Sequence, residues 1–281
     1  MDHVFSQVDV FSGQAFAGNP LAVVHGATGI STEQMLDITS WTNLSETAFL
    51  LPASDPQADY GVRIFCPGRE LPFAGHPTLG SCAAWLAAGG APRDPDRIVQ
   101  ECGAGLVSIR RDGPRLAFAA PPLVRSGPVD ESLLDDRLDA LGVARSNVVD
   151  SAWIDNGPGW MGVLLDSART VLEVAPPPGP LPGFDVGLVG LHSAGSECAI
   201  EVRGFFADAV GAIREDPVTG SLNASIAQWL IGTGRLAAPY VARQGTAIGR
   251  SGRVFIDVDQ GDVWVGGQCS IPIAGTITIE R

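Results

Sequence analysis

The sequence predicts an α/β protein that is built from two similar modules in tandem. A strand motif at residues 62–65, VRIF, recurs as VRGF at residues 202–205, an offset of 140 (202 − 62). An alanine-rich helical segment that contains Trp85 has a counterpart that contains Trp229. Each half therefore carries a strand, a proline-bearing turn and an Ala-rich helix in the same order, which is typical of an internal duplication.

The individual elements follow from local patterns. Ser31 or Thr32 is a good N-cap and opens a first helix over 31–43, and the Asp112-Gly113 pair predicts a hairpin. The polar, proline-rich segment 122–135 is expected to be a linker. The predicted hairpin spans 105–122. Short strands are predicted where β-branched and aromatic residues lie between turn residues, at 3–11, 21–26, 46–52, 60–67, 160–166, 198–207, 245–250, 252–259 and 262–268.

The composition limits the classes of partner. The formal charge is 18 − 31 = −13, which argues against binding to phosphate backbones or to anionic membranes. No signal peptide or apolar run of membrane-spanning length is evident. The five cysteines show no CxxC pair and are expected to be free, mostly buried thiols in a reducing cytoplasm. We therefore expect a cytoplasmic protein with a small-molecule partner.

Two turns carry the candidate chemistry, because each delivers the chain into a predicted helix, at 76–88 and at 220–232. The first, GHPTLG, holds His76, and the second, DPVTGS, holds Asp216 and Ser221. The free N–H groups of a helix N-terminus form an anion site, so both turns suit a carboxylate substrate. Taken singly, each side chain is also an ordinary capping, turn-forming or structural residue.

Glu46 is a third candidate, at the entrance of an apolar strand. Ser45 precedes it, and Leu44 and Phe49 supply apolar neighbours. Partial desolvation raises the pKa of a carboxyl group toward neutrality, where the group can both accept and return a proton. From the local sequence alone, a solvated glutamate at a strand start is the more common interpretation.

Five motifs in order make the chain resemble the PhzF family, phenazine-biosynthesis-like proteins that share the diaminopimelate-epimerase fold. They span nearly the whole chain and lie at 9–24, 43–52, 62–80, 101–107 and 215–224. The resemblance implies two pseudo-symmetric modules, each a curved, mostly antiparallel sheet wrapped around a central helix.

The expected domains are 1–125, with the last strand 270–281 as a possible addition, and 126–269. A pseudo-two-fold between them would bring the two helix-entry turns together across a cleft. A homodimer is also expected.

The resemblance also implies roles for named residues. Carried over motif by motif, it places the family's glutamate, histidine, aspartate and serine at Glu46, His76, Asp216 and Ser221. Glu46, His76 and Asp216 are therefore the expected catalytic residues. The expected substrate-binding residues are Ser221, Ser45 beside Glu46, and Gly75 and Gly220, which allow close backbone approach at the two helix starts. Glu46 is implied as the residue that shuttles the proton. The reaction implied for the phenazine enzyme is the isomerisation of trans-2,3-dihydro-3-hydroxyanthranilate, a step in antibiotic biosynthesis.

Cofactor-independent epimerases of this fold use one thiol at each helix-entry turn. In this sequence those positions look like Ala74 and Asp216, and none of the five cysteines occupies them. Proton shuttling by a single carboxylate is therefore favoured over a two-thiol epimerisation. No metal cluster or nucleotide motif appears, so no cofactor or metal is expected. The alternatives are an isomerase or epimerase of another small or cyclic amino acid, and a non-catalytic binding module of the same fold.

Overall fold

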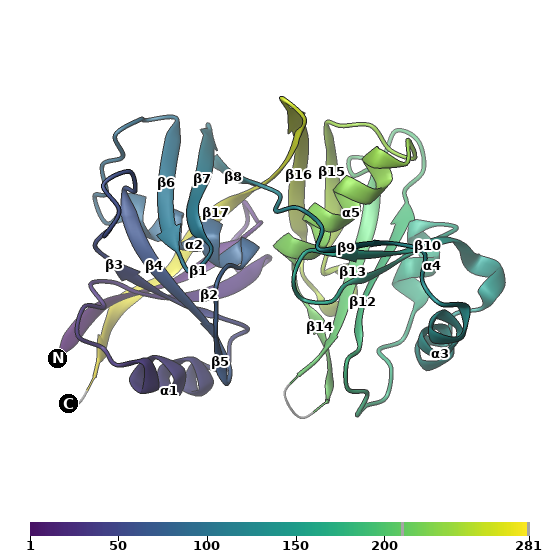
Figure 1. The fold of residues 1–281 in the computed structure, drawn as a ribbon, viewed down its shortest axis with the longest axis horizontal. Helices are drawn as coiled ribbons and strands as arrows, with labels where there is room; N and C mark the ends of the chain where they lie inside the picture. Colours follow the sequence, from purple (N-terminus) through teal and green to yellow (C-terminus); the bar gives the residue numbers. More distant parts are fainter. Residues whose placement is uncertain (209–210, 280–281) are drawn as a thin grey trace. The chain divides into compact units, whose positions relative to one another are not determined.

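The computed structural model describes residues 1–208 and 211–279 and divides the chain into two compact units (Figure 1). The first unit contains Met1–Ala119 and the chain from Gly266 onward, and the second contains Ala120–Val265. The boundary that the sequence placed near residue 125 thus lies after Ala119. The returning segment begins at residue 266 instead of 270.

The first unit is a closed ladder of strands around one helix. The ladder runs β17–β1–β2–β3–β4–β6–β7–β8 and returns to β17, with β5 paired to β4 as a short side branch. The β2–β3 and β4–β6 pairs are parallel. The elements are β1 (Asp2–Val10), β2 (Asn19–Val24), α1 (Thr32–Thr42), β3 (Thr47–Leu51), β4 (Tyr60–Cys66), β5 (Arg69–Leu71), α2 (Gly75–Ala87), β6 (Arg97–Cys102), β7 (Gly105–Asp112), β8 (Arg115–Ala119) and part of β17 (Asp262–Thr278).

The second unit repeats part of this pairing pattern. Its ladder runs β9–β10–β11–β12–β13–β15–β16, with β14 as a branch on β13, and the β11–β12 and β13–β15 pairs are parallel. The elements are β9 (Arg125–Gly127), α3 (Glu131–Leu141), η1 (Arg145–Asn147), β10 (Val148–Asp155), β11 (Met161–Leu165), α4 (Ala168–Glu173), β12 (Asp185–Leu191), β13 (Ile200–Ala207), β14 (Ile213–Asp216), α5 (Gly220–Gly232), β15 (Tyr240–Gln244), η2 (Thr246–Ile248) and β16 (Gly252–Asp259).

The predicted fold class is confirmed, because both units are mostly antiparallel sheets with one central helix each. The two VR-F motifs lie on corresponding strands, β4 and β13, and each is followed by a short strand and then by the helix. The helices α2 and α5 begin within one residue of the predicted starts. The pseudo-two-fold between the units stays a prediction.

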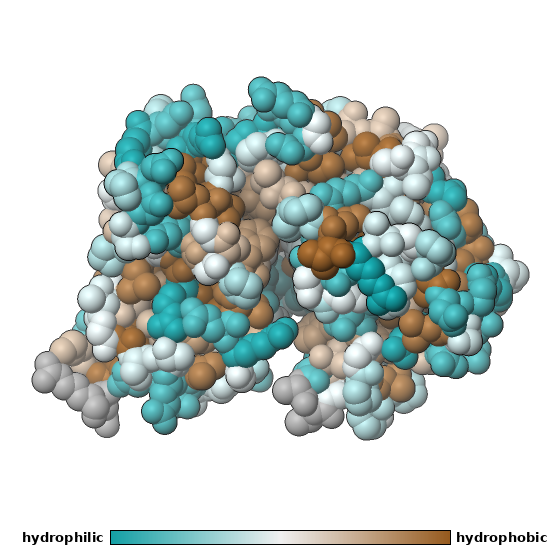
Figure 2. All heavy atoms as spheres, in the orientation of Figure 1, coloured by the Kyte–Doolittle hydropathy of each residue, from teal (hydrophilic) through white to brown (hydrophobic). Residues whose placement is uncertain are grey.

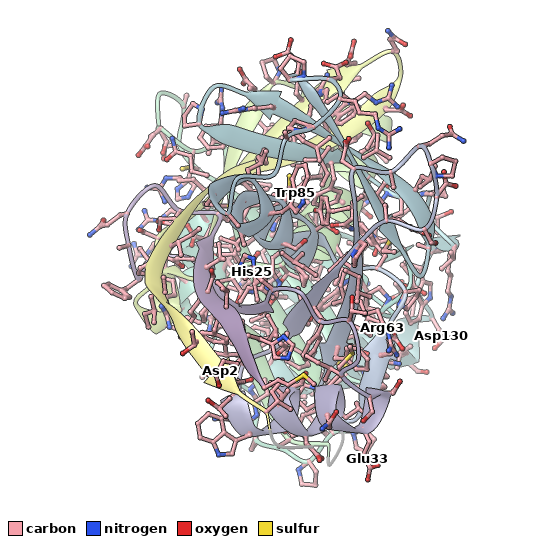
Figure 3. All side chains as sticks on the ribbon, turned by 90° about the vertical axis from the view of Figure 1, so that its left-hand side faces the viewer. Asp2, His25, Glu33, Arg63, Trp85 and Asp130 are labelled. Atoms are coloured by element: carbon pink, nitrogen blue, oxygen red, sulfur yellow. The ribbon has the colours of Figure 1, made fainter. Side chains whose placement is uncertain are left out.

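The central helices are enclosed, as their apolar sequences predict. Figure 3 looks onto the first unit and shows α2, marked by Trp85, among the surrounding strands. Gly80 of α2 lies so close to β1 and β2 that an added Cβ would be 2.5 Å from the side chain of Leu21. Helix α2 is therefore packed directly against β1 and β2 at Gly80.

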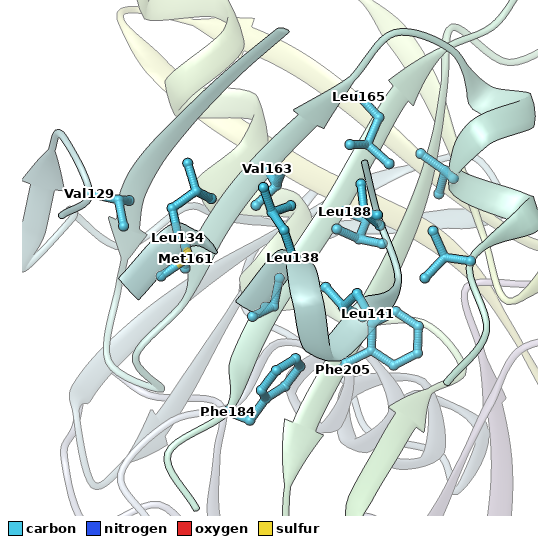
Figure 4. Close-up of a cluster of buried hydrophobic side chains, with 14 residues drawn as sticks. Val129, Leu134, Leu138, Leu141, Met161, Val163, Leu165, Phe184, Leu188 and Phe205 are labelled. Atoms are coloured by element: carbon cyan, nitrogen blue, oxygen red, sulfur yellow. The ribbon is translucent and has the colours of Figure 1, made fainter. Parts of the chain in front are cut away.

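The prediction of a linker over 122–135 is wrong. This segment contains β9 and the start of α3, where Asp130 caps the helix by accepting hydrogen bonds from the N–H groups of Ser132 and Leu133. Leucines of α3 with helical spacing, Leu134, Leu138 and Leu141, pack on β11 and β12 in a buried cluster (Figure 4). The polar residues between them masked this amphipathic pattern.

The five cysteines are free thiols, but only Cys82 and Cys198 are buried and the other three are half-buried. The surface is mixed, and Figure 2 shows polar residues interspersed with smaller hydrophobic patches on the face that it presents. Among the described residues, no helix is long and apolar enough to cross a membrane.

Candidate active site

Glu46 and His76 lie next to each other in the first unit. Helix α1 ends at Thr42, Asn43 turns the chain in a left-handed conformation (φ 55°), and Ser45 and Glu46 then lead into β3. His76 is the second residue of α2. Its Nε2 atom is 3.5 Å from Oε2 of Glu46, and the two side chains are 5% and 18% exposed. The structure thus brings together two of the three predicted catalytic residues.

Burial sets the protonation state of His76. It lowers the pKa of the imidazole to about 3, so His76 is neutral at physiological pH. Its buried Nε2 atom makes no hydrogen bond with the described residues. A neutral imidazole at this position can exchange hydrogen bonds with a carboxyl group in either protonation state, whereas an imidazolium would hold the carboxyl group ionised.

The pH dependence of stability tests this assignment. An unfolded histidine titrates near pH 6.5 and folded His76 near 3, so the unfolded state binds more protons between these values. The contribution of His76 is therefore intact above about pH 6.5 and is lost as the pH falls. The loss reaches about 2 kcal/mol at pH 5. Urea denaturation at pH 7 and pH 5 should show a smaller difference for His76→Gln than for the wild type. His3→Gln, outside the site, is the control, and equal pH dependence in the wild type and His76→Gln would contradict a buried neutral His76.

The start of α2 leaves backbone donors for a ligand. Its N-cap is Ala74, which has no side chain that can satisfy the first N–H groups of the helix. The helix dipole adds about half a positive charge at this end. Gly75 and His76 are therefore positioned for an anion close to Glu46, although the chain as a whole is acidic.

Cys66 is a further ionisable neighbour of Glu46, and no motif in the sequence marks it. It ends β4, and the charge of Glu46 contributes to the electrostatics of its thiol. Burial raises the pKa of Cys66, so the group is a thiol and not a thiolate at neutral pH. It lacks the ionisation that a thiol base needs. Glu46 remains the stronger candidate for proton transfer.

The second unit carries Asp216 at the end of β14. Asp216 is buried, at 8% exposure, and its Oδ2 atom accepts a hydrogen bond of 2.6 Å from the hydroxyl of Thr219, the N-cap of α5. Strand β14 is fixed to β13 by the pairing of Gly204 with Asp216. A bidentate ion pair between Arg203 and Glu215 also holds it there.

Ser221 is oriented by the loop between β10 and β11. Trp160 Nε1 donates to Ser221 Oγ at 3.1 Å, and Asn156 Nδ2 donates to the main-chain oxygen of Ser221 at 3.0 Å. The indole N–H can only donate, so the hydroxyl of Ser221 accepts from it and keeps its own proton for another acceptor. The hydroxyl of Ser221 can therefore donate to a ligand that has acceptor oxygens.

The predicted site residues therefore form two groups, one in each unit. Ser45, Glu46, Gly75 and His76 belong to the first unit, and Asp216, Gly220 and Ser221 to the second. That both groups act on one substrate stays a prediction. Among the described residues, no three His, Cys, Asp or Glu side chains are grouped to hold a metal ion.

Comparison with known proteins gives relatives that extend over nearly the whole chain. A curated protein of Schizosaccharomyces pombe, named antisense-enhancing sequence 1, is 34% identical and covers 98% of each chain. A trans-2,3-dihydro-3-hydroxyanthranilate isomerase of Pseudomonas aeruginosa is 32% identical over 90% of this chain and 89% of its own. A solved structure of a predicted epimerase from the same organism has a TM-score of 0.80 at 25% identity and covers 99% of this chain and 100% of its own.

The family is shown by both the motifs and the profile match. The profile of the phenazine biosynthesis-like proteins, PhzC-PhzF, matches residues 8–278. The names of the relatives include isomerases, which agrees with the class of enzyme that the sequence predicts. The chain belongs to the PhzC-PhzF family of phenazine biosynthesis-like proteins.

Proposed function

We propose that the protein is an isomerase in which Glu46 moves a proton between two carbon atoms of a small carboxylic acid. The observation that carries this proposal is the position of Glu46, 3.5 Å from a buried and neutral His76 at the first turn of α2. A partly buried carboxyl group beside an uncharged imidazole can both accept and release a proton. The nearby backbone N–H groups offer a place for the carboxylate of the substrate.

In the proposed reaction, Glu46 removes an acidic C–H proton, the double bonds of the substrate shift, and Glu46 returns the proton to another carbon on the same face. Ser45 and Gly75 in the first unit, and Gly220 and Ser221 in the second, bind the substrate. His76 orients the substrate or Glu46, and Asp216 has a supporting role. The proposal thus uses both groups of residues on one substrate, and no cofactor is involved.

The first substrate to test is trans-2,3-dihydro-3-hydroxyanthranilate. Its choice rests on the isomerase relative that is 32% identical over 90% of this chain. The wild-type protein is expected to change the absorbance of this compound. NMR of the product formed in D₂O should show a new C–H bond that retains part of the original hydrogen, because one carboxyl group carries the proton both ways. An unchanged spectrum at high enzyme concentration would rule out this substrate.

The alternative is an epimerase of a small or cyclic amino acid, which the name of the 25% identical predicted epimerase favours. An epimerase would incorporate one deuterium from D₂O at a single stereocentre and produce the opposite stereoisomer. The identity of the residues opposes a two-thiol mechanism, because Ala74 and Asp216 occupy the helix-entry positions. Binding of these acids without any hydrogen exchange would instead indicate a non-catalytic binding module.

A further inference from the structure

A buried glutamine lies beside the central helix in each unit. Gln100 of β6 accepts from the hydroxyls of Tyr60 and Ser81 and donates to Oγ1 of Thr78 at 3.2 Å. Gln244 of β15 bonds to the turn before α5. Both glutamine side chains are fully buried. The proposed reaction assigns no role to either residue.

The hydrogen bonds of Gln244 fix the direction of its amide. Its Oε1 atom accepts from the backbone N–H of Thr219 at 3.0 Å, and its Nε2 atom donates to the main-chain oxygen of Asp216 at 3.1 Å. A backbone N–H can only donate and a carbonyl can only accept, so the opposite orientation of the amide would lose both bonds. Asn223 adds a second bond to Oε1 at 2.7 Å.

This direction determines what the hydroxyl of Thr219 does. Gln244 Nε2 donates to Thr219 Oγ1 at 2.9 Å, so the hydroxyl oxygen is an acceptor on that side. Its single proton then points to Oδ2 of Asp216, 2.6 Å away. A hydrogen bond that is donated to a carboxylate stabilises its ionised form.

The first unit provides a comparison within the same chain. Thr78 also accepts from a buried glutamine, but it donates to the main-chain oxygen of Ala74 at 2.9 Å. The N-cap of α2 is Ala74, which has no hydroxyl, whereas the N-cap of α5 is Thr219. Of the two turns, therefore, only the one before α5 has a hydroxyl that a buried glutamine directs onto a carboxylate. That carboxylate is Asp216.

We propose that Thr219 and Gln244 are positioning residues that keep Asp216 ionised and fixed while Glu46 carries the proton. The proposal rests on the proposed function for the catalytic meaning of Asp216, but the hydrogen-bond chain itself can be tested without a substrate. It assigns different tasks to the two carboxyl groups. Asp216 stays charged through the reaction, and Glu46 alternates between its two protonation states.

The test is an NMR titration of the full-length protein with ¹³C-labelled aspartate carboxyl groups. The signal of Asp216 is assigned as the one that disappears in Asp216→Asn. In Thr219→Val the titration midpoint of this signal should rise by about one pH unit, the scale of one hydrogen bond to a charged group. In Thr219→Ser, which keeps the hydroxyl, the midpoint should stay near the wild-type value.

Thr78→Val is the matched control, because it removes a buried hydroxyl beside a glutamine at the start of the other central helix. It is expected to lower stability without moving the Asp216 signal. Gln244→Leu provides a second variant and should raise the midpoint in the same direction. An unchanged midpoint in Thr219→Val, or an equal shift in Thr78→Val, would overturn the proposal. Failure to find a substrate would leave this titration and its outcome intact.

Discussion

Replacing Glu46 by glutamine is expected to abolish turnover, with a loss of at least about 10²–10⁴-fold, the usual scale for removing a general acid–base group. Glutamine keeps the shape of the side chain and its capacity for hydrogen bonds, but it cannot accept and return a proton. Binding of the substrate or of a stable analogue should survive. Turnover is measured by the absorbance change on an established substrate, and binding by calorimetry.

The other two catalytic candidates provide the comparison. His76→Ala and Asp216→Asn are expected to be slow but measurable, because neither residue carries the proton in the proposed reaction. Near-full turnover of Glu46→Gln together with an inactive Asp216→Asn would reverse the roles of the two carboxyl groups. Loss of binding in Glu46→Gln would instead show that Glu46 is needed to hold the substrate.

Replacing Glu215 by glutamine is expected to reduce the free energy of unfolding by about 3–5 kcal/mol, the usual cost of breaking a buried ion pair on one side. Glu215 and Arg203 are 5% and 1% exposed, so the substitution leaves a buried guanidinium without its counter-charge. Arg203 also donates to the main-chain oxygens of Val171 and Val174 at the end of α4. These bonds satisfy carbonyl groups but do not neutralise the charge.

The first unit contains a matched control for this substitution. Arg63 and Glu70 form the corresponding bidentate pair between β4 and β5, and both partners are more exposed, at 29% and 39%. Arg63 is labelled in Figure 3. Solvent screens this pair, so Glu70→Gln should cost no more than about 1 kcal/mol. Urea denaturation of both variants measures the difference, and similar losses would show that burial does not set the strength of these pairs.

The repeat and the helix ends were the parts of the fold that the sequence made predictable. Apolar residues on all sides identified α2 and α5 as enclosed helices, and Asp112-Gly113 identified a hairpin between β7 and β8. Helix α3 was not predicted, because its buried leucines lie in a segment whose many acidic residues favoured a polar linker. These leucines pack on β11 and β12, and the local sequence does not show that apolar surface.

The candidate site was predictable only where a motif marked it. His76 and Asp216 lie in turns with recognisable composition, and their position at the helix starts follows from those turns. Gln244 lies 28 residues after Asp216 (244 − 216), and nothing in the strand around it distinguishes it from any other glutamine. Its role arises from the parallel pairing of β13 with β15, which brings distant segments together.

Strand β17 has a consequence for how the chain acquires its fold during synthesis. The first unit needs this strand to close its ladder, because β1 pairs with it from Asp2↔Thr278 to Val10↔Cys269. The ribosome makes residues 1–119 first, yet their partner strand emerges only after the whole of the second unit. The second unit is continuous, so its segment emerges completely before the first unit receives its last strand. The unit that carries Glu46 and His76 is thus the later one to be completed. Until then, the edge of β1 that pairs with β17 lacks its native partner and can pair with a wrong strand.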